Sequence, residues 1–356
     1  MKNKTIMLII VLILIIISII YLQKSNPAVP TNNLNLNNNP VAPELTGITG
    51  YINANDTLSI SSLKGKVVLV DFWTYSCINC IRTLPHLVEW DKKYKNNGLV
   101  IIGVHTPEFD FEKNIDNVKS AVKEYDIEYP VVLDNNYATW NAYSNSFWPR
   151  KYLIDSKGYI HYNHIGEGSY EETEIKIREL LTEAGYTIPE EVSTLTDTTP
   201  KKSQTPELYT GYDFALPRNQ DIGNSEGLAP DISTTYQLPS NIKDDVIYLD
   251  GTWISNKDNL ATATNSEASI VLSFVSSAAN IVADSSNGSI KVEVLINDKY
   301  VSKESAGSDV IFENNIPYIT VDKPKLYNVF KGDYSRYKLT LKINKEGFSF
   351  NSFTFG

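Results

Sequence analysis

The sequence predicts two domains, an α/β domain followed by an all-β sandwich, and one transmembrane helix near the N-terminus. Three observations lead to this prediction. Residues 67–73 form an apolar, β-branched run typical of a buried strand, and the apolar residues after it recur at the spacing of a helix face. Beyond residue 246, apolar and polar residues alternate in short segments. Residues 6–22 are apolar and uncharged.

Length and charge limit the possible functions. The chain has 356 residues, enough for two domains that each bury a core. Its formal net charge of -10, with no cluster of Lys and Arg in the sequence, excludes a nucleic-acid surface. With only two cysteines the chain is not a disulfide scaffold, so its thiols are free for chemistry.

The apolar run at 6–22 is preceded by Lys2 and Lys4 and followed by Lys24. As a helix it would extend roughly 26 Å, enough to cross a bilayer core once. A cleaved signal peptide is the alternative, but the run exceeds a usual signal core and no A-x-A site follows it. Lysines before the span predict a cytoplasmic N-terminus and domains on the extracytoplasmic face of the cell membrane. Residues 23–45, rich in Asn and Pro, predict a flexible tether.

Residues 46–186 alternate between strand and helix patterns and define the α/β domain. Pro85 lies inside the helix expected after residue 77 and should bend it, and Gly98 is the expected glycine at its C-terminal end. The expected elements are strands at 58–60, 67–73, 99–105 and 130–133, helices at 78–97, 112–125 and 137–143, a hairpin of strands 152–154 and 159–161, and a closing helix at 171–184.

Cys77 and Cys80 lie where the strand at 67–73 passes into the helix. At a helix start, unpaired backbone N–H groups and the helix dipole favour a thiolate, so Cys77 is the expected nucleophile, exposed and acidic. One helical turn brings the Cα of Cys80 within roughly 5 to 6 Å, inside the range that a disulfide requires. The pair therefore predicts a dithiol that opens and closes without refolding.

Three other roles for the cysteines are weaker. A structural disulfide would close such a short ring that loop entropy gives only roughly 2 kcal/mol. Zinc needs further ligands, and none of the four histidines has zinc-finger spacing. Burial as inert thiols explains a cysteine but not this spacing at a helix start. The pattern favours redox chemistry with no metal and no bound cofactor.

The segment from 66 to 85 resembles the thioredoxin superfamily, in which C-x-x-C lies near a βαβ unit. Asp71, six residues before Cys77, matches the superfamily's buried acid, and Pro85, eight residues after it, matches the helix-kinking proline. A longer pattern is similar to the soluble part of DipZ-type thiol–disulfide proteins in the TlpA-like group. It comprises W-T-Y-S-C-I-N-C-I-R-T-L-P at 73–85, Trp148-Pro149 before Y-L-I-D at 152–155, and G-E-G at 166–168.

This resemblance implies roles for further residues. Asp71 is expected to be buried, to have a raised pKa and to accept the proton of Cys80. Thioredoxin-like proteins hold a cis proline against the C-x-x-C, so Pro149 is expected to be cis and, with Trp148, to contact the substrate. Thr83 departs from the group, whose reductases often carry Glu there, so proton handling is expected to rest on Asp71.

Neighbours of the dithiol are expected to play smaller parts. Tyr75, Arg82 and His86 are expected to be solvated loop or helix residues, although their closeness to Cys77 leaves a tuning role open. The middle pair Ile78-Asn79 matches neither the Gly-Pro of thioredoxin nor the Pro-His of strong oxidants. The redox potential is therefore not inherited from either.

The second half of the chain begins with a linker. Residues 187–205 are rich in Ser, Thr, Pro and Glu, and the segment to 245 stays turn-rich with its structure left open. Residues 246–356 carry short alternating strands, for example at 270–274, 290–296 and 337–343, which predict the sandwich. Near the end, aromatic residues alternate at even positions (Phe348 and Phe350) and then at odd positions (Phe353 and Phe355). Keeping all four on one face of a strand requires an extra residue, as in a β-bulge.

Residues 246–356 also resemble carbohydrate-binding jelly-roll modules. Tyr248 and Trp253 would be the candidate aromatic platform for a sugar, but core positions explain them at least as well. A spacer or partner-docking module is the preferred interpretation.

The leading functional hypothesis is a membrane-anchored thiol–disulfide oxidoreductase that exchanges the Cys77-Cys80 pair with exported cysteine-containing proteins. The alternatives are a cell-surface or carbohydrate-binding protein that binds a glycan, with the α/β domain as a scaffold, and a thiol peroxidase. If the protein acts as a reductant, its single span implies a separate membrane electron donor.

Overall fold

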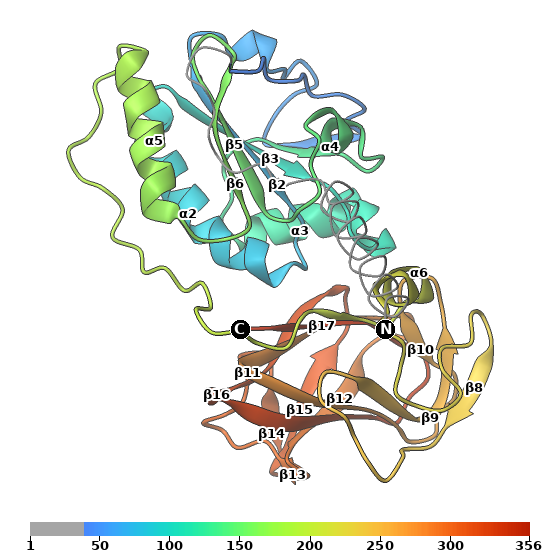
Figure 1. Cartoon of the computed structure of the whole chain (residues 1–356). Coiled ribbons are helices and arrows are strands. Elements are labelled where there is room, and N and C mark those ends of the chain that lie inside the picture. Colours follow the sequence, from blue (N-terminus) through green and yellow to red (C-terminus); the bar gives the residue numbers. More distant parts are fainter. Residues whose placement is uncertain (1–38) are drawn as a thin grey trace, which may run out of the picture. The chain divides into compact units, whose positions relative to one another are not determined.

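The computed structural model describes residues 39–356, of which 41–356 form one compact unit (Figure 1). The expected anchor at 6–22 and most of the expected tether at 23–45 lie outside the described residues. Between residues 39 and 356, the structure contains no helix with the length and apolar character needed to cross a membrane.

The first domain is built on a sheet of six strands in the order β1-β4-β3-β2-β5-β6. The central strand β2 pairs in parallel with β3 and antiparallel with β5. This order places the strand that leads into Cys77 in the middle of the sheet. The strands are β1 (Gly50–Ile52), β2 (Val67–Trp73), β3 (Leu99–His105), β4 (Val131–Leu133), β5 (Arg150–Ile154) and β6 (Ile160–Ile165).

Helices cover both faces of this sheet (Figure 1). Leu69 and Trp73 of β2 pack into the core beneath α2 (Ile78–Tyr94), α3 (Ile115–Glu124) and α5 (Tyr170–Glu183). The alternate residues Val70 and Phe72 pack on the opposite face with α4 (Ala138–Ala142). Because side chains alternate along a strand, Asp71 lies on the same face as α2.

Helix α2 carries the dithiol and ends as the sequence predicts. Pro85 lies within it, and a short 3-10 helix, η2 (Lys95–Asn97), follows it. Gly98 ends the segment with φ of 95°, in the left-handed region that favours glycine. A Cβ at this position would lie 2.4 Å from the ring of Tyr186, so this glycine is also required for close packing.

Most of the expected elements of the first domain are confirmed, with three exceptions. The expected strand at 58–60 is wrong, since the chain turns there and enters the 3-10 helix η1 (Ser61–Leu63). Strand β1 was not expected. The helix expected from 112 begins later because η3 (Asp110–Lys113) precedes it and Asn114 caps α3 by accepting from the N–H of Asp116.

The second domain is a large β-sheet structure with its own core. The main strand order is β14-β15-β12-β16-β11-β17-β10-β9-β8. The expected bulge is confirmed: β11 pairs Val282 with Ser352 and Ala283 with Phe350, which leaves Asn351 unpaired. The strands are β7 (Leu208–Tyr209), β8 (Ser233–Tyr236), β9 (Ile247–Ser255), β10 (Leu260–Thr262), β11 (Ala268–Ser285), β12 (Ile290–Ile296), β13 (Lys299–Tyr300), β14 (Ile311–Glu313), β15 (Ile316–Val321), β16 (Lys325–Ile343) and β17 (Phe348–Phe355).

The turn-rich segment before residue 246 contributes to this second core. Strands β7 and β8 pair with β17 and β9, and the short helices α6 (Tyr212–Ala215) and η4 (Leu216–Arg218) lie between them. Leu208, Ala215 and Tyr236 are buried in the same cluster as the sheet residues. The sequence left the structure of this segment open because it has few apolar residues at regular spacing.

Candidate active site

Cys77 is the N-cap of α2. Its backbone is extended, with φ of -81° and ψ of 115°, and its Sγ accepts a hydrogen bond of 3.3 Å from the backbone N–H of Cys80. Both cysteines are free thiols. Cys77 is half-buried, whereas Cys80 is buried in the core beneath α2. The helix start therefore presents one accessible sulfur and one shielded sulfur.

The two thiols differ in acidity. Burial raises the pKa of Cys77, and the carboxylates of Glu207 and Glu108 raise it further. Burial and the neighbouring Cys77 hold the pKa of Cys80 well above its ordinary value. The expected order, with Cys77 the more acidic thiol, agrees with this pattern. The expected low pKa of Cys77 is wrong, because burial outweighs the hydrogen bond from Cys80.

Asp71 lies in the core below the dithiol, as expected. It is 1% exposed, and burial raises its pKa from 3.8 to about 7, against an opposing effect from Lys151. Its negative charge also raises the pKa of Cys80. A carboxyl group with a pKa near neutrality can accept and release a proton at physiological pH.

Lys151 is a functional candidate that sequence reasoning missed. It lies on β5 directly opposite Asp71 of β2 and is fully buried. In the sequence it follows Arg150 and directly precedes the apolar and aromatic run Y-L-I at 152–154. A lysine next to such a run, two residues after Pro149, was the available signal.

The peptide bond between Trp148 and Pro149 is cis, as expected. Trp148 Nε1 donates a hydrogen bond of 3.0 Å to the carbonyl oxygen of Thr106, and its ring centroid lies 4.3 Å from that of Trp140. Trp148 and Cys77 both pack at the edge of the same core cluster. Trp148 also packs against the core on the opposite face of the sheet, and Thr106, to which it is bound, donates its N–H to the carbonyl oxygen of Trp73 at the end of β2.

Acidic residues from both domains approach Cys77. Tyr209 of β7 donates a hydrogen bond of 2.6 Å to Oε1 of Glu108, which follows β3. Burial raises the pKa of Glu207 to about 7 and holds that of Glu108 well above its ordinary value. Glu112 Oε1 accepts a hydrogen bond of 2.5 Å from the hydroxyl of Ser76. The reactive sulfur therefore faces carboxyl groups.

Apolar residues beside the dithiol also contact the second domain. Ile78 and Ile81 of α2 pack against the second core. Phe109 belongs to that core, and its ring lies 5.4 Å from the ring of Phe214. Residues of the second domain therefore cover part of the surface next to Cys77.

Three residues expected to be solvated are buried or tightly held. Tyr75 and His86 are each 3% exposed. His86 stacks face to face on Tyr170 at 3.6 Å. Arg82 donates two hydrogen bonds to the carboxylate of Glu167. It donates a third, of 2.8 Å, to the carbonyl oxygen of Gly356. The expectation of solvated side chains is wrong because α2 is covered by α5, by the loop before α5 and by the second domain.

The aromatic platform considered for a sugar does not exist. Tyr248 and Trp253 are both buried, and Trp253 Nε1 donates to the carbonyl oxygen of Asp250. Within residues 39–356, no cluster of His, Cys, Asp and Glu could hold a metal ion.

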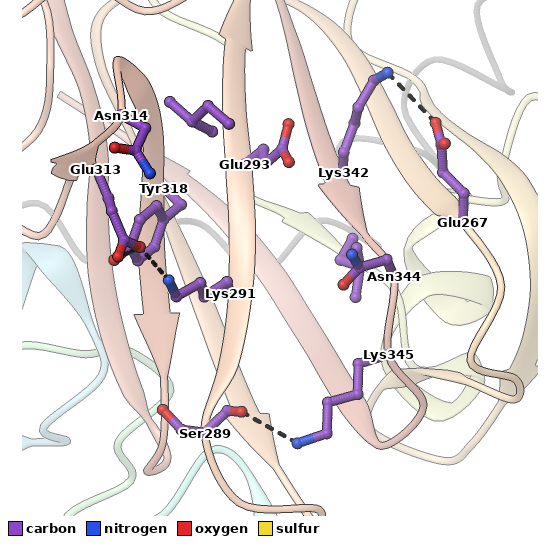
Figure 2. Close-up of a pocket in the computed structure, with 12 residues that line it drawn as sticks. Glu267, Ser289, Lys291, Glu293, Glu313, Asn314, Tyr318, Lys342, Asn344 and Lys345 are labelled. Atoms are coloured by element: carbon purple, nitrogen blue, oxygen red, sulfur yellow. Dashed lines mark hydrogen bonds and ion pairs between the residues drawn. The ribbon is translucent and has the colours of Figure 1, made fainter.

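A pocket of about 510 Å³ lies on the second sheet (Figure 2). Lys342 reaches Glu267 at 3.4 Å, and Lys345 donates to the carbonyl oxygen of Ser289. The ring of Tyr318 is covered by Lys291, whose Nζ lies 4.3 Å from its centroid. The pocket is therefore lined by side chains that bind one another, and its aromatic face is not open for stacking.

Two families match this chain. Residues 37–181 match the Redoxin family, and residues 205–356 match the family described as "Thioredoxin like C-terminal domain". The first match contains both cysteines, and the second begins close to β7.

Curated relatives extend this result. Protein DipZ of Mycobacterium bovis is 42% identical over 238 residues, which cover 65% of this chain and 33% of DipZ. This chain therefore spans about a third of the length of that relative. Thiol-disulfide oxidoreductase ResA of Bacillus cereus is 33% identical over 117 residues, covering 33% of this chain and 65% of ResA. Thiol-disulfide oxidoreductase YkuV of Bacillus subtilis is 28% identical over 141 residues, covering 40% of this chain and 94% of YkuV.

The fold, the cysteine pair at the start of α2 and these relatives agree with one another. The Redoxin match, the match to the thioredoxin-like C-terminal family and the similarity to DipZ are consistent with the resemblance to the thioredoxin superfamily.

Proposed function

We propose that this protein is a thiol–disulfide oxidoreductase that exchanges the Cys77-Cys80 pair with disulfides of partner proteins. One observation carries the proposal: a half-buried Cys77 caps α2, and a buried Cys80 one turn later lies near the ionisable Asp71. The names of ResA and YkuV, both called thiol-disulfide oxidoreductases, support it.

The chemistry proceeds in two steps when the dithiol acts as reductant. The Cys77 thiolate attacks one sulfur of a substrate disulfide, so that a mixed disulfide forms and the other substrate sulfur leaves as a thiolate. Cys80 then loses its proton to Asp71, and its sulfur attacks that of Cys77. The mixed disulfide breaks, the second substrate thiolate leaves, and the Cys77-Cys80 disulfide remains. The reverse sequence oxidises a dithiol substrate.

Trp148 and Pro149 are proposed to contact the substrate. Both stand at the start of β5, and the side chain of Trp148 is fixed by Thr106 and Trp140. If this fixed aromatic ring lies beside the substrate path, it would suit an extended peptide that approaches Cys77.

The cellular setting is also a proposal. Residues 6–22 would anchor the protein in the cell membrane, with residues 23–45 as the tether and both domains on the extracytoplasmic face. The partners would be exported cysteine-containing proteins, and a separate membrane electron donor would re-reduce the dithiol. Residues 46–186 would form the redox domain. The jelly-roll sandwich predicted for 246–356 would serve as spacer or docking module, together with β7 and β8 from the segment 187–245 that pair with its sheet.

A trapping experiment tests the function. Cys80→Ser should accumulate mixed disulfides on Cys77 with exported proteins, because no neighbouring thiol releases them. Cys77→Ser is the matched control and should trap nothing. Equal trapping by both variants would overturn the assignment of roles to the two cysteines. No adducts together with no disulfide reduction would contradict the proposed function. Glycan retention without reductase activity would favour the binding-protein alternative, and peroxide consumption the peroxidase.

The anchor has its own test. The full chain should stay with membranes after alkaline extraction. Recovery of a soluble form that begins after residue 24 would show that 6–22 is removed.

A further inference from the structure

Glu112 is a fully buried acid in η3, the short 3-10 helix that follows β3. Its exposure is 0%, and acids are almost never fully buried without partners. Its Oε2 accepts hydrogen bonds from the backbone N–H groups of Glu108, at 2.5 Å, and Phe109, at 3.0 Å. Because Phe109 is the N-cap of η3, this half of the carboxylate closes its own helical turn.

The other carboxylate oxygen reaches a different part of the chain. Oε1 of Glu112 accepts a hydrogen bond of 2.5 Å from the hydroxyl of Ser76 and one of 3.4 Å from its N–H. Ser76 is 1% exposed and directly precedes Cys77. Closure of the helical turn accounts for Oε2 only, so the bonds at Oε1 have another role. They tie the loop before Cys77 to residues 106–114, which we call the bridging segment.

The first residues of the bridging segment are fixed within the first domain. The N–H of Thr106 donates a hydrogen bond of 3.1 Å to the carbonyl oxygen of Trp73, and the hydroxyl of Tyr137 donates to that of Pro107. The segment is therefore attached to the end of β2 ahead of η3. Glu112 attaches it a second time, to the loop that follows β2.

The middle of the bridging segment is held by the second domain. Phe109 is buried in the second core, where its ring lies 5.4 Å from the ring of Phe214 in α6. The N–H of Asp110 donates a hydrogen bond of 3.2 Å to Oδ2 of Asp258, which lies between β9 and β10. The turn that Glu112 closes thus has one side in the second domain and the other on the loop before Cys77.

This loop determines how Cys77 caps α2. The N–H of Cys77 donates a hydrogen bond of 3.4 Å to the carbonyl oxygen of Thr74, and Sγ of Cys77 accepts one of 3.3 Å from the N–H of Cys80. A thiolate that accepts a backbone N–H at a helix start is stabilised. If Ser76 were free to move, the bond to Sγ would weaken and the fraction of thiolate would fall.

We propose that Glu112 is a positioning residue through which the second domain sets the geometry of the reactive cysteine: its carboxylate holds Ser76 in place, while the second core holds Phe109 of the same turn. The inference rests on the proposed function, in which the Cys77 thiolate makes the first attack on a substrate disulfide.

Titratable groups from several elements face Glu112. They are Tyr75 before α2, Tyr137 before α4, Glu108 of the bridging segment and Glu207 of the second domain. Burial raises the pKa of Glu112, and its hydrogen-bond donors lower it. All four hydrogen bonds described above come from N–H or O–H donors, so the surroundings of Glu112 fit a carboxylate.

The test measures the alkylation of Cys77 by iodoacetamide as a function of pH in the reduced full-length protein, resolved by mass spectrometry. In Ser76→Ala the pH midpoint should rise by about half a unit, because the bond from Cys80 weakens but is not lost, and alkylation at pH 7 should be about threefold slower. Ser120→Ala is the matched control, because this exposed hydroxyl of α3 donates within its own helix, to the carbonyl oxygen of Asp116. It should leave the profile unchanged.

Two double variants locate the coupling. In a Glu112→Met background, Ser76→Ala should add no further shift, because no carboxylate remains to accept its hydroxyl. Phe214→Ala, which loosens Phe109 in the second core, should itself raise the midpoint and should reduce the effect of Ser76→Ala to less than half. Ile311→Ala, which shortens an exposed apolar side chain of β14, is its control and should change nothing.

The cysteine and the acidic residues that act on the Cys77 thiol stay in place in these variants; they are Cys80, Glu108 and Glu207. The shifts therefore report geometry. Ile78 and Ile81 also contact the second core, so the second domain has a direct route to α2 as well. Additive shifts of Ser76→Ala and Phe214→Ala would mean that the second domain acts by that route, independently of Glu112.

Such additivity would overturn the inference, and so would a midpoint that does not rise in Ser76→Ala or in Phe214→Ala. If Glu112→Met does not fold, the cycle of Ser76 and Phe214 decides alone. Failure of the proposed function looks different. The wild-type protein would then exchange no disulfides, while alkylation of the free thiol would still show whether the two positions are coupled.

Discussion

The buried carboxyl of Asp71 should make the first domain less stable as the pH rises. Burial raises its pKa from 3.8 to about 7, so the folded protein binds this proton more tightly than the unfolded chain does. The associated stability is fully present below about pH 4 and is lost as the pH rises through about 7. Three pKa units at about 1.4 kcal/mol each give about 4 kcal/mol in total, of which about 3 kcal/mol falls between pH 5 and 8.

The variant Asp71→Asn removes this titration. We expect the wild-type protein to lose about 3 kcal/mol between pH 5 and 8 and the variant to lose much less, because an amide does not ionise. Urea unfolding followed by tryptophan fluorescence measures the free energy of unfolding at each pH. Four of the five tryptophans lie in the first domain: Trp73, Trp90, Trp140 and Trp148. Parallel pH dependence in the two proteins would refute the burial of an ionising carboxyl at this position.

Three further predictions concern the thiols and the end of α2. Iodoacetamide should alkylate Cys77 before Cys80, yet more slowly at pH 7 than an unstructured cysteine, because burial raises both pKa values; faster labelling of Cys80, resolved by mass spectrometry, would contradict this. Glu207→Gln should lower the pKa of Cys77 and speed its alkylation at pH 8, where the native carboxyl is ionised, with little change at pH 5; equal rates at pH 8 would remove the carboxylate from the reactive environment. Gly98→Ala should destabilise the first domain by more than about 1 kcal/mol, because φ is 95° and the new methyl group would meet Tyr186; an unchanged urea midpoint would show that the backbone relaxes there.

Local patterns predicted the core of the redox domain well. The strand at 67–73, the helix that starts after Cys77 and its end at Gly98 follow from apolar spacing, helix termination signals and a single glycine. The bulge at Asn351 could be predicted because the aromatic residues shift from even to odd positions along the strand. One extra residue is needed to keep them on the same face. These features depend on neighbours along the chain.

What the sequence did not predict depends on contacts between distant segments. Lys151 lies just before the strand predicted at 152–154, and only the pairing of β5 with β2 places it opposite Asp71. His86 seemed solvated because its cover, Tyr170, lies on a helix far along the chain. The raised pKa of Cys77 depends partly on Glu207 of the second half. No period or motif in one segment encodes such pairings.

The packing of Ile78, Ile81 and Phe109 against the second core has a practical consequence for how the redox domain is studied. If the first domain were separated from the second at the linker, these side chains would form an exposed apolar patch near Cys77. An exposed apolar patch of this kind favours nonspecific binding, so we expect it to affect which substrates the fragment selects. Substrate preference should therefore be measured with both domains present.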